Sequence, residues 1–235
     1  MKEQYVGDAN DYRKYALLRA LSGGGQVIIG IAWMLTPADG GNDGNKLAYL
    51  EKPALREFDP ELFDLLKHVS GAPDRRRLVL IEENATVPNA IYFNATLPDA
   101  LLGRRGYFAE MRAHLQTADL IFYDPDNGLD VPSKGKGGKN SSKYVYRDEI
   151  EATFASGHSV LVYQHFPHEE RVGFVRRRGV DLGRLCASST VWAFSTAHVV
   201  FLLVVNPQHM ATVGVHAERA ASVWPASFIR GQRLV

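Results

Sequence analysis

The sequence has little cysteine and no long apolar run. Its one cysteine, Cys186, cannot form an internal disulfide, which suits a reducing compartment, and we expect it to be a small buried side chain. The longest apolar run, VVFLLVV at residues 199–205, is too short to span a bilayer, and the first fifteen residues lack the apolar segment of a signal peptide. We therefore expect a cytoplasmic protein with no membrane partner.

An excess of charge of either sign is also missing. Lysine and arginine total 27 against 26 for aspartate and glutamate, so no overall field attracts a nucleic acid, and an anionic partner must be held locally. The glycine-rich stretches match neither GxGxxG nor GxxxxGK, and no HExxH motif or strained serine elbow occurs. The sequence thus offers no support for a pyrophosphate loop, a zincin or a standard hydrolase triad.

The chain does contain enough apolar material for one α/β domain spanning residues 1–235, with 46% apolar and 23% charged residues. Five apolar runs have the length of strands, and because they do not alternate with polar residues they indicate strands covered on both faces, as in a parallel sheet. These predicted strands are residues 27–35, 77–82, 120–124, 159–165 and 199–205.

Segments with helical periodicity separate these runs, at residues 11–22, 59–71, 105–118 and 146–157. The alternation predicts a single Rossmann-like, doubly wound and mostly parallel sheet with helices on both faces. We also expect a helical insertion at about residues 47–75. Two irregular stretches, 36–46 and a flexible basic loop at about 132–143, should lie at the carboxyl ends of strands, where open α/β sheets bind ligands.

The sharpest local feature is LIFYDPDNGLD at residues 120–130. A buried strand ends there on Asp124, Pro125, Asp126 and Asn127, and the proline and the following glycine turn the backbone sharply away from the sheet. The carboxylates and exposed carbonyls would form a cluster of acceptors for an amino group, a ribose or a metal. The same residues also make a good turn, so a purely structural role stays open.

Further candidates are weaker. GDANDYRKY at residues 7–15 places Asp11 and Lys14 on one helix face, which also suits a simple cap and ion pair. Glu82 would end a strand, where an acid often binds ribose hydroxyls. Gln164 and His165 should line the cleft. Lysines of the basic loop would contact a phosphate backbone or form a solvated loop, and they are Lys134, Lys136, Lys139 and Lys143.

The order of these landmarks resembles the Rossmann-like S-adenosylmethionine-dependent methyltransferases, and most closely the bacterial methyltransferase J family, which N6-methylates an adenine of large-subunit ribosomal RNA. That family opens with Gly-Asn-x-x-Asp-x-x-Lys running into a helix, and this chain matches it at Gly7, Asp11 and Lys14. It has Asp-Pro-Pro-Tyr where DPDNG stands here, and a late strand ending in Asn-Pro, here Asn206 and Pro207.

The resemblance implies a methyltransferase that uses S-adenosylmethionine and acts on a nucleic-acid base or a nucleotide. Asp124 and Pro125 would hold the target amino group, with Asp126 and Asn127 completing the catalytic tip. Residues implied to border the cofactor are Gly7, Asp8, Asp11, Lys14, Thr36, Glu82 and Asn94. Since Asp126 and Asn127 replace a proline and an aromatic, a ring that stacks on the base would come from elsewhere, with Tyr123, Phe166 and Tyr144 as candidates.

Two other classes stay open on the same fold. Clustered carboxylates suit Mg²⁺ or Mn²⁺ and would make a metal-dependent nuclease, phosphodiesterase or nucleotide hydrolase. The acids predicted to meet at one sheet edge are Asp8, Asp11, Asp39, Asp43, Asp124 and Asp126. A protein that binds nucleotide or nucleic acid without catalysis is the third possibility. The sequence does not predict an oligomeric state.

Overall fold

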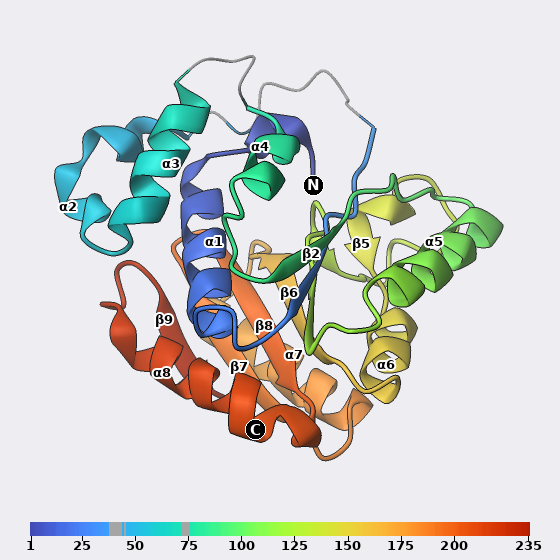
Figure 1. Ribbon diagram of the computed structural model, residues 1–235. Coiled ribbons are helices and arrows are strands. Elements are labelled where there is room, and N and C mark those ends of the chain that lie inside the picture. Colours follow the sequence, from blue (N-terminus) through green and yellow to red (C-terminus); the bar gives the residue numbers. More distant parts are fainter. Residues whose placement is uncertain (38–43, 45, 72–75) are drawn as a thin grey trace.

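The computed structural model describes residues 1–37, 44, 46–71 and 76–235, and its centre is a seven-stranded mixed sheet (Figure 1). The strand order is β2-β1-β3-β6-β8-β7-β9. The strands are β1 (Ile29–Ala32), β2 (Ala90–Phe93), β3 (Leu120–Tyr123), β6 (Ser159–His165), β7 (Thr190–Ser195), β8 (Val199–Val205) and β9 (Arg230–Arg233). A separate pair joins β4 (Gly128–Leu129) to β5 (Tyr144–Val145) in parallel.

Strands β2, β1, β3 and β6 are parallel, whereas β8 runs antiparallel to both β6 and β7, and β9 runs antiparallel to β7. The α/β class is confirmed. The expectation of a parallel strand at residues 199–205 is wrong, because β8 returns through a short hairpin from β7 and a hairpin makes neighbours antiparallel.

Helices cover both faces of the sheet, as predicted. Side chains of β1, β3, β6 and β8 alternate between two apolar clusters, which is the period-two pattern of a strand covered on both sides. One cluster packs against α1 (Ala9–Ser22), α3 (Pro60–Ser70), α4 (Leu78–Glu83) and α8 (Val215–Val223). The other packs against α5 (Leu101–His114), α6 (Arg147–Ala155) and α7 (Arg171–Leu185). None of the helices in the described ranges is long and apolar enough to cross a membrane.

The segment at residues 77–82 is helix α4 and not the predicted strand. Leu78 and Ile81 are buried and lie three residues apart, so one helix face meets the core, while the strand of this region is β2. Glu82 therefore does not end a strand, and its Oε1 accepts a hydrogen bond of 2.8 Å from Trp33 Nε1. Asn94 is the residue that follows β2, and it is exposed.

Three predicted helices, namely α1, α3 and α6, lie close to their expected ranges. Asp59 caps α3 by accepting from Leu62 N, and the helix has Pro60 in its first turn, as the sequence predicts. The expected helical insertion contains the helices α2 (Pro53–Arg56) and α3 together with short turns. Its residues 72–75 lie outside the described part. The single cysteine, Cys186, is free and buried.

Candidate functional site

The carboxyl ends of the parallel strands meet the start of α1 at one edge of the sheet. Ala32, the last residue of β1, pairs with Tyr123, the last residue of β3, so the chain leaves both strands at the same level. From β1 the chain passes to β2 on one side, and from β2 it crosses to β3 on the other side. This reversal is the kind of position at which open α/β sheets bind ligands.

A cavity of about 440 Å³ opens at this edge. Of the residues singled out in the sequence, those lining it are Asp8, Asp11, Lys14, Asp124, Pro125, Asp126, Asn127, Lys143 and His165. Segments more than a hundred residues apart in the chain thus share one space. Asp39 and Asp43 lie outside the described residues.

The tip after β3 is fixed by backbone contacts. Asp124 N donates to Ala32 O at 3.1 Å, Asn127 N donates to Lys143 O at 2.9 Å, and Asn127 O accepts from His165 N at 3.2 Å. Gly128 has a φ of +122°, which allows the chain to turn into β4. The buried amide of Gln164 accepts from Leu129 N and donates to Asn127 O, so this predicted substrate ligand instead braces the tip.

Helix α1 supplies the opposite wall. Asp8 is its N-cap, with Oδ1 accepting from Asn10 N at 2.7 Å and from Asp11 N at 3.0 Å, which satisfies amides at the start of the helix. Gly7, at a φ of +78°, donates its N–H to Asp11 Oδ2 at 3.0 Å. The structural interpretation of this motif as a cap and an ion pair is therefore correct, and the same residues also face the cavity.

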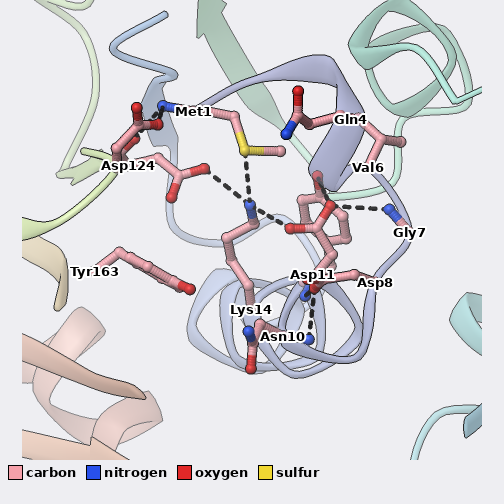
Figure 2. Close-up of polar contacts among 12 residues, drawn as sticks. Met1, Gln4, Val6, Gly7, Asp8, Asn10, Asp11, Lys14, Asp124 and Tyr163 are labelled. Atoms are coloured by element: carbon pink, nitrogen blue, oxygen red, sulfur yellow. Dashed lines mark hydrogen bonds and ion pairs between the residues drawn. The ribbon is translucent and has the colours of Figure 1, made fainter. Parts of the chain in front are cut away.

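Lys14 joins the two walls. Its Nζ lies 2.6 Å from Asp11 Oδ1 and 2.8 Å from Asp124 Oδ2, and Figure 2 shows the ammonium group between the two carboxylates. Burial disfavours the charged lysine, but the two carboxylates outweigh it and raise the pKa of Lys14. Lys14 therefore remains charged and holds Asp124 in place.

Burial favours the protonated form of each acid, but the neighbouring groups give their pKa values different directions. Burial raises the pKa of Asp11 to about 6 against the opposing effect of Lys14, with Asp8 and Asp124 adding to the rise. The pKa of Asp8 is also raised, chiefly by burial. For Asp126 the effect of burial is outweighed by the α-ammonium of Met1, Thr36 and Lys2, and its pKa is lowered.

Other predicted residues lie around the cavity without lining it. Thr36 donates from Oγ1 to Asp126 Oδ2 at 2.8 Å and so orients that carboxylate. Lys136 pairs with Asp148 and Glu149 of α6, which directs it away from the cavity. Lys134 and Lys139 are not part of the lining, and of the four loop lysines Lys143 alone reaches it. Asn206 and Pro207 follow an antiparallel strand, so they lie at the opposite edge, where Asn206 N donates to Ser159 Oγ.

Several lining residues were not predicted, namely Met1, Lys2, Tyr5, Asn10, Lys46 and Tyr163. Tyr163 could have been found, because it lies two residues before His165 on β6 and therefore on the same face. Its hydroxyl is 3.3 Å from His165 Nε2. Tyr123 instead points into the core, where its hydroxyl bonds to Thr153, so it is not a stacking ring.

The described part of the chain contains no group of three or more His, Cys, Asp or Glu side chains arranged to hold a metal ion. The carboxylates Asp11 and Asp124 instead share the Lys14 ammonium. Two buried oxygens of lining residues, Asn10 Oδ1 and Asp126 Oδ1, have no hydrogen-bond partner among the described residues, although Asp126 Oδ1 has the Met1 ammonium at 3.0 Å as an ion-pair partner. Asn10 Oδ1 has no such ion pair. A ligand with an N–H or O–H group could supply that partner.

No protein-family model matches the chain, and no curated protein matches it in sequence. The geometry of the cavity, together with the motifs that line it, is therefore the basis for a functional proposal.

Proposed function

We propose that the chain is an S-adenosylmethionine-dependent methyltransferase that acts on an amino group of a nucleic-acid base or a nucleotide. One observation carries the proposal: Lys14, from the motif that opens the chain, contacts Asp124, from the tip that would hold the substrate, at 2.8 Å across 110 residues of sequence. The two motifs on which the resemblance depends thus border the same cavity.

The residues present fit such a cofactor. S-adenosylmethionine carries an ammonium group, a sulfonium and a carboxylate, and the wall of the cavity has side chains of both signs. Its acids are Asp8, Asp11, Asp124 and Asp126, and its lysines are Lys2, Lys14, Lys46 and Lys143. Its volume of about 440 Å³ lies in the range of small-molecule sites. The orphaned Asn10 Oδ1 gives a nucleoside hydroxyl or amino group an acceptor.

The bound cofactor would supply a methyl group already activated on sulfur. The contribution of the protein is then orientation. The Asp124 carboxylate and the Pro125 carbonyl accept hydrogen bonds from the target amino group, which directs its lone pair toward the methyl carbon. With both groups bound, the amino nitrogen would take up the methyl group as the C–S electron pair returned to sulfur, and the nitrogen would release one proton.

His165 is placed to accept that proton. It lies at the end of β6 and lines the cavity, and burial lowers its pKa although Asp124 and Asp8 oppose the shift. The imidazole is therefore neutral at pH 7, as an acceptor must be. Lys14 acts as a positioning residue, because it holds the Asp124 carboxylate.

Calorimetry with S-adenosylhomocysteine in EDTA tests the proposal. The wild-type chain should bind it, and Asp8→Asn, which keeps a capping side chain but removes a carboxylate implied to border the cofactor, should weaken binding by at least about tenfold, the loss expected for a charge-assisted contact. The matched control is Asp130→Asn, since Asp130 pairs with Arg147 and does not line the cavity. No binding by folded wild-type chain, or binding and phosphodiester cleavage that both require Mg²⁺, would contradict the proposal.

A further inference from the structure

The α-ammonium group of Met1 is bound at the carboxyl edge of the sheet. It donates to Met34 O at 3.2 Å and to Asp124 O at 3.0 Å, and it lies 3.0 Å from Asp126 Oδ1. Figure 2 shows this nitrogen close to the Asp124 backbone. Two carbonyls accept hydrogen bonds from the ammonium group, and one carboxylate oxygen pairs with its charge, so the surroundings suit a primary ammonium group. We call these three acceptors the ammonium site.

The ammonium site is built by the ends of the two strands at which the sheet order reverses. Met34 follows β1 with a φ of +48°, a left-handed conformation that costs energy for a residue other than glycine, and Asp124 follows β3. Thr36 Oγ1 fixes the third acceptor by donating to Asp126 Oδ2. Both residues of the ion pair are largely buried, since the side chains of Met1 and Asp126 are 4% and 7% exposed.

The occupant also resembles a ligand in its chemistry. Met1 lines the cavity, and its Sδ lies 3.8 Å from Lys14 Nζ, so the ammonium and the thioether of one methionine both border the proposed cofactor site. Met1 and Lys2 precede the first helical turn, which begins at Glu3, so no regular element holds them. A buried carboxylate such as Asp126 needs a cation, and any ammonium group of the right shape could replace that of Met1.

We propose that the ammonium site is the binding site for the α-ammonium group of an α-amino-acid moiety, and that Met1 occupies it when no such ligand is bound. The inference deepens the proposed function and rests on it for one ligand, the methionyl end of S-adenosylmethionine. The N-terminal methionine and the ligand then exclude each other, so binding moves Met1 out of the cavity.

The first experiment measures how far Met1 occupies the ammonium site when no ligand is present. The Met1 amine is acylated by an amine-selective reagent at neutral pH, and the product is quantified by peptide mass spectrometry. In the folded wild-type chain the amine should react at least about tenfold more slowly than in the urea-unfolded chain, because it reacts only when the site opens. Asp126→Asn should remove most of this protection and Asp130→Asn none of it. Should Asp126→Asn fail to fold, Thr36→Val, which leaves Asp126 without its orienting hydroxyl, should remove part of it. Equal rates in folded and unfolded wild-type chain would overturn the inference, whether or not S-adenosylhomocysteine binds.

Ligands then test the exchange. S-adenosylhomocysteine should raise the acylation rate of Met1 severalfold, whereas 5′-methylthioadenosine, which keeps the nucleoside and thioether but lacks the amino-acid moiety, should not. Binding of S-adenosylhomocysteine with Met1 still protected would overturn the inference and leave the proposed function standing. If S-adenosylhomocysteine does not bind, the proposed function fails, and L-methionine is then compared with 3-(methylthio)propionate, which lacks the amino group. Faster acylation of Met1 with L-methionine alone supports the ammonium site. No change in the acylation rate with L-methionine overturns it.

Discussion

Lys14 is a single ammonium group shared by two buried carboxylates, and this imbalance is the main feature of the site at the level of residues. Asp11 and Asp124 each lie within 2.8 Å of it, and Asp8 is close enough to raise the pKa of Asp11. A cluster with more acids than bases in a low-dielectric place holds protons more tightly than free carboxyl groups do.

The pH dependence of stability tests this imbalance. The pKa of Asp11 rises from 3.8 to about 6, so the folded state holds a proton that the unfolded chain has released between these values. The stabilising contribution is complete below about pH 4 and is lost as the pH rises through about 6. Asp11→Asn carries no such proton. We measure the free energy of unfolding of both proteins with urea. The variant minus wild-type difference should therefore become more positive by roughly 2 kcal/mol between pH 4 and pH 7.

A difference between the two proteins that stayed constant across this range would show that Asp11 titrates normally. Because the comparison uses a difference, groups that do not interact with Asp11 cancel to first order. Asp148→Asn is the control, since this exposed carboxylate pairs with Lys136 outside the cavity, and the difference between that variant and the wild type should not change in the same way.

At the scale of elements, the tip after β3 depends on Gly128 and on the neighbouring strand β6. A Cβ at Gly128 would lie 2.5 Å from the amide carbon of Gln164, and the φ of +122° is unfavourable for any side chain. We expect Gly128→Ala to lower the free energy of unfolding by about 1–3 kcal/mol, because the strained backbone and the displaced Gln164 add up. Urea unfolding measures the loss.

Gly106→Ala is the matched control for that variant. Gly106 lies inside α5 and has open space where its Cβ would be, so this change should leave stability unchanged or raise it by up to about 1 kcal/mol. If Gly128→Ala were as stable as the wild type, the tip would not be held by Gln164.

The sequence predicted the elements whose signals are local. Residues 159–165 and 199–205 are strands with the expected bounds, and Asp59, Pro60 and Gly71 mark a helix correctly. The run at 77–82 was misread because its four consecutive apolar residues fit a short strand or a short helix equally well. The four residues of β2 are only half-buried, so their apolar signal is short and weak.

In the candidate site, too, the parts with local sequence signals could be predicted and the parts without them could not. The tip and the α1 motif could be predicted, because turn residues after an apolar run and a cap before a helix are local patterns. The positions of Met1 and Lys2 could not be predicted, because no sequence pattern near these residues indicates which buried carboxylate will pair with their positive charges. The direction of β8 was missed because burial on both faces does not fix strand direction.

At the scale of the whole molecule, the candidate site lies where the two layers of core meet the edge of the sheet. Tyr163, on the face of α1, belongs to one apolar cluster, and its neighbour Val162 belongs to the other. The two clusters share every strand of the central sheet from β1 to β8. Loss of packing on one face would therefore remove the support of the cavity from both sides.

A single cooperative unit is the consequence we expect, in line with the predicted single domain. Tryptophan fluorescence reports on the cluster that contains Trp33 and Trp192, whereas Cys186 lies in the opposite cluster, where burial raises the pKa of its thiol to about 12 and blocks its reaction. Far-UV circular dichroism reports on both. The three probes should give one urea midpoint, because strands shared by the two clusters cannot remain ordered when either face is exposed. Thiol labelling that begins at clearly lower urea than the fluorescence change would mean that α7 and its face of the sheet unfold as a separate unit.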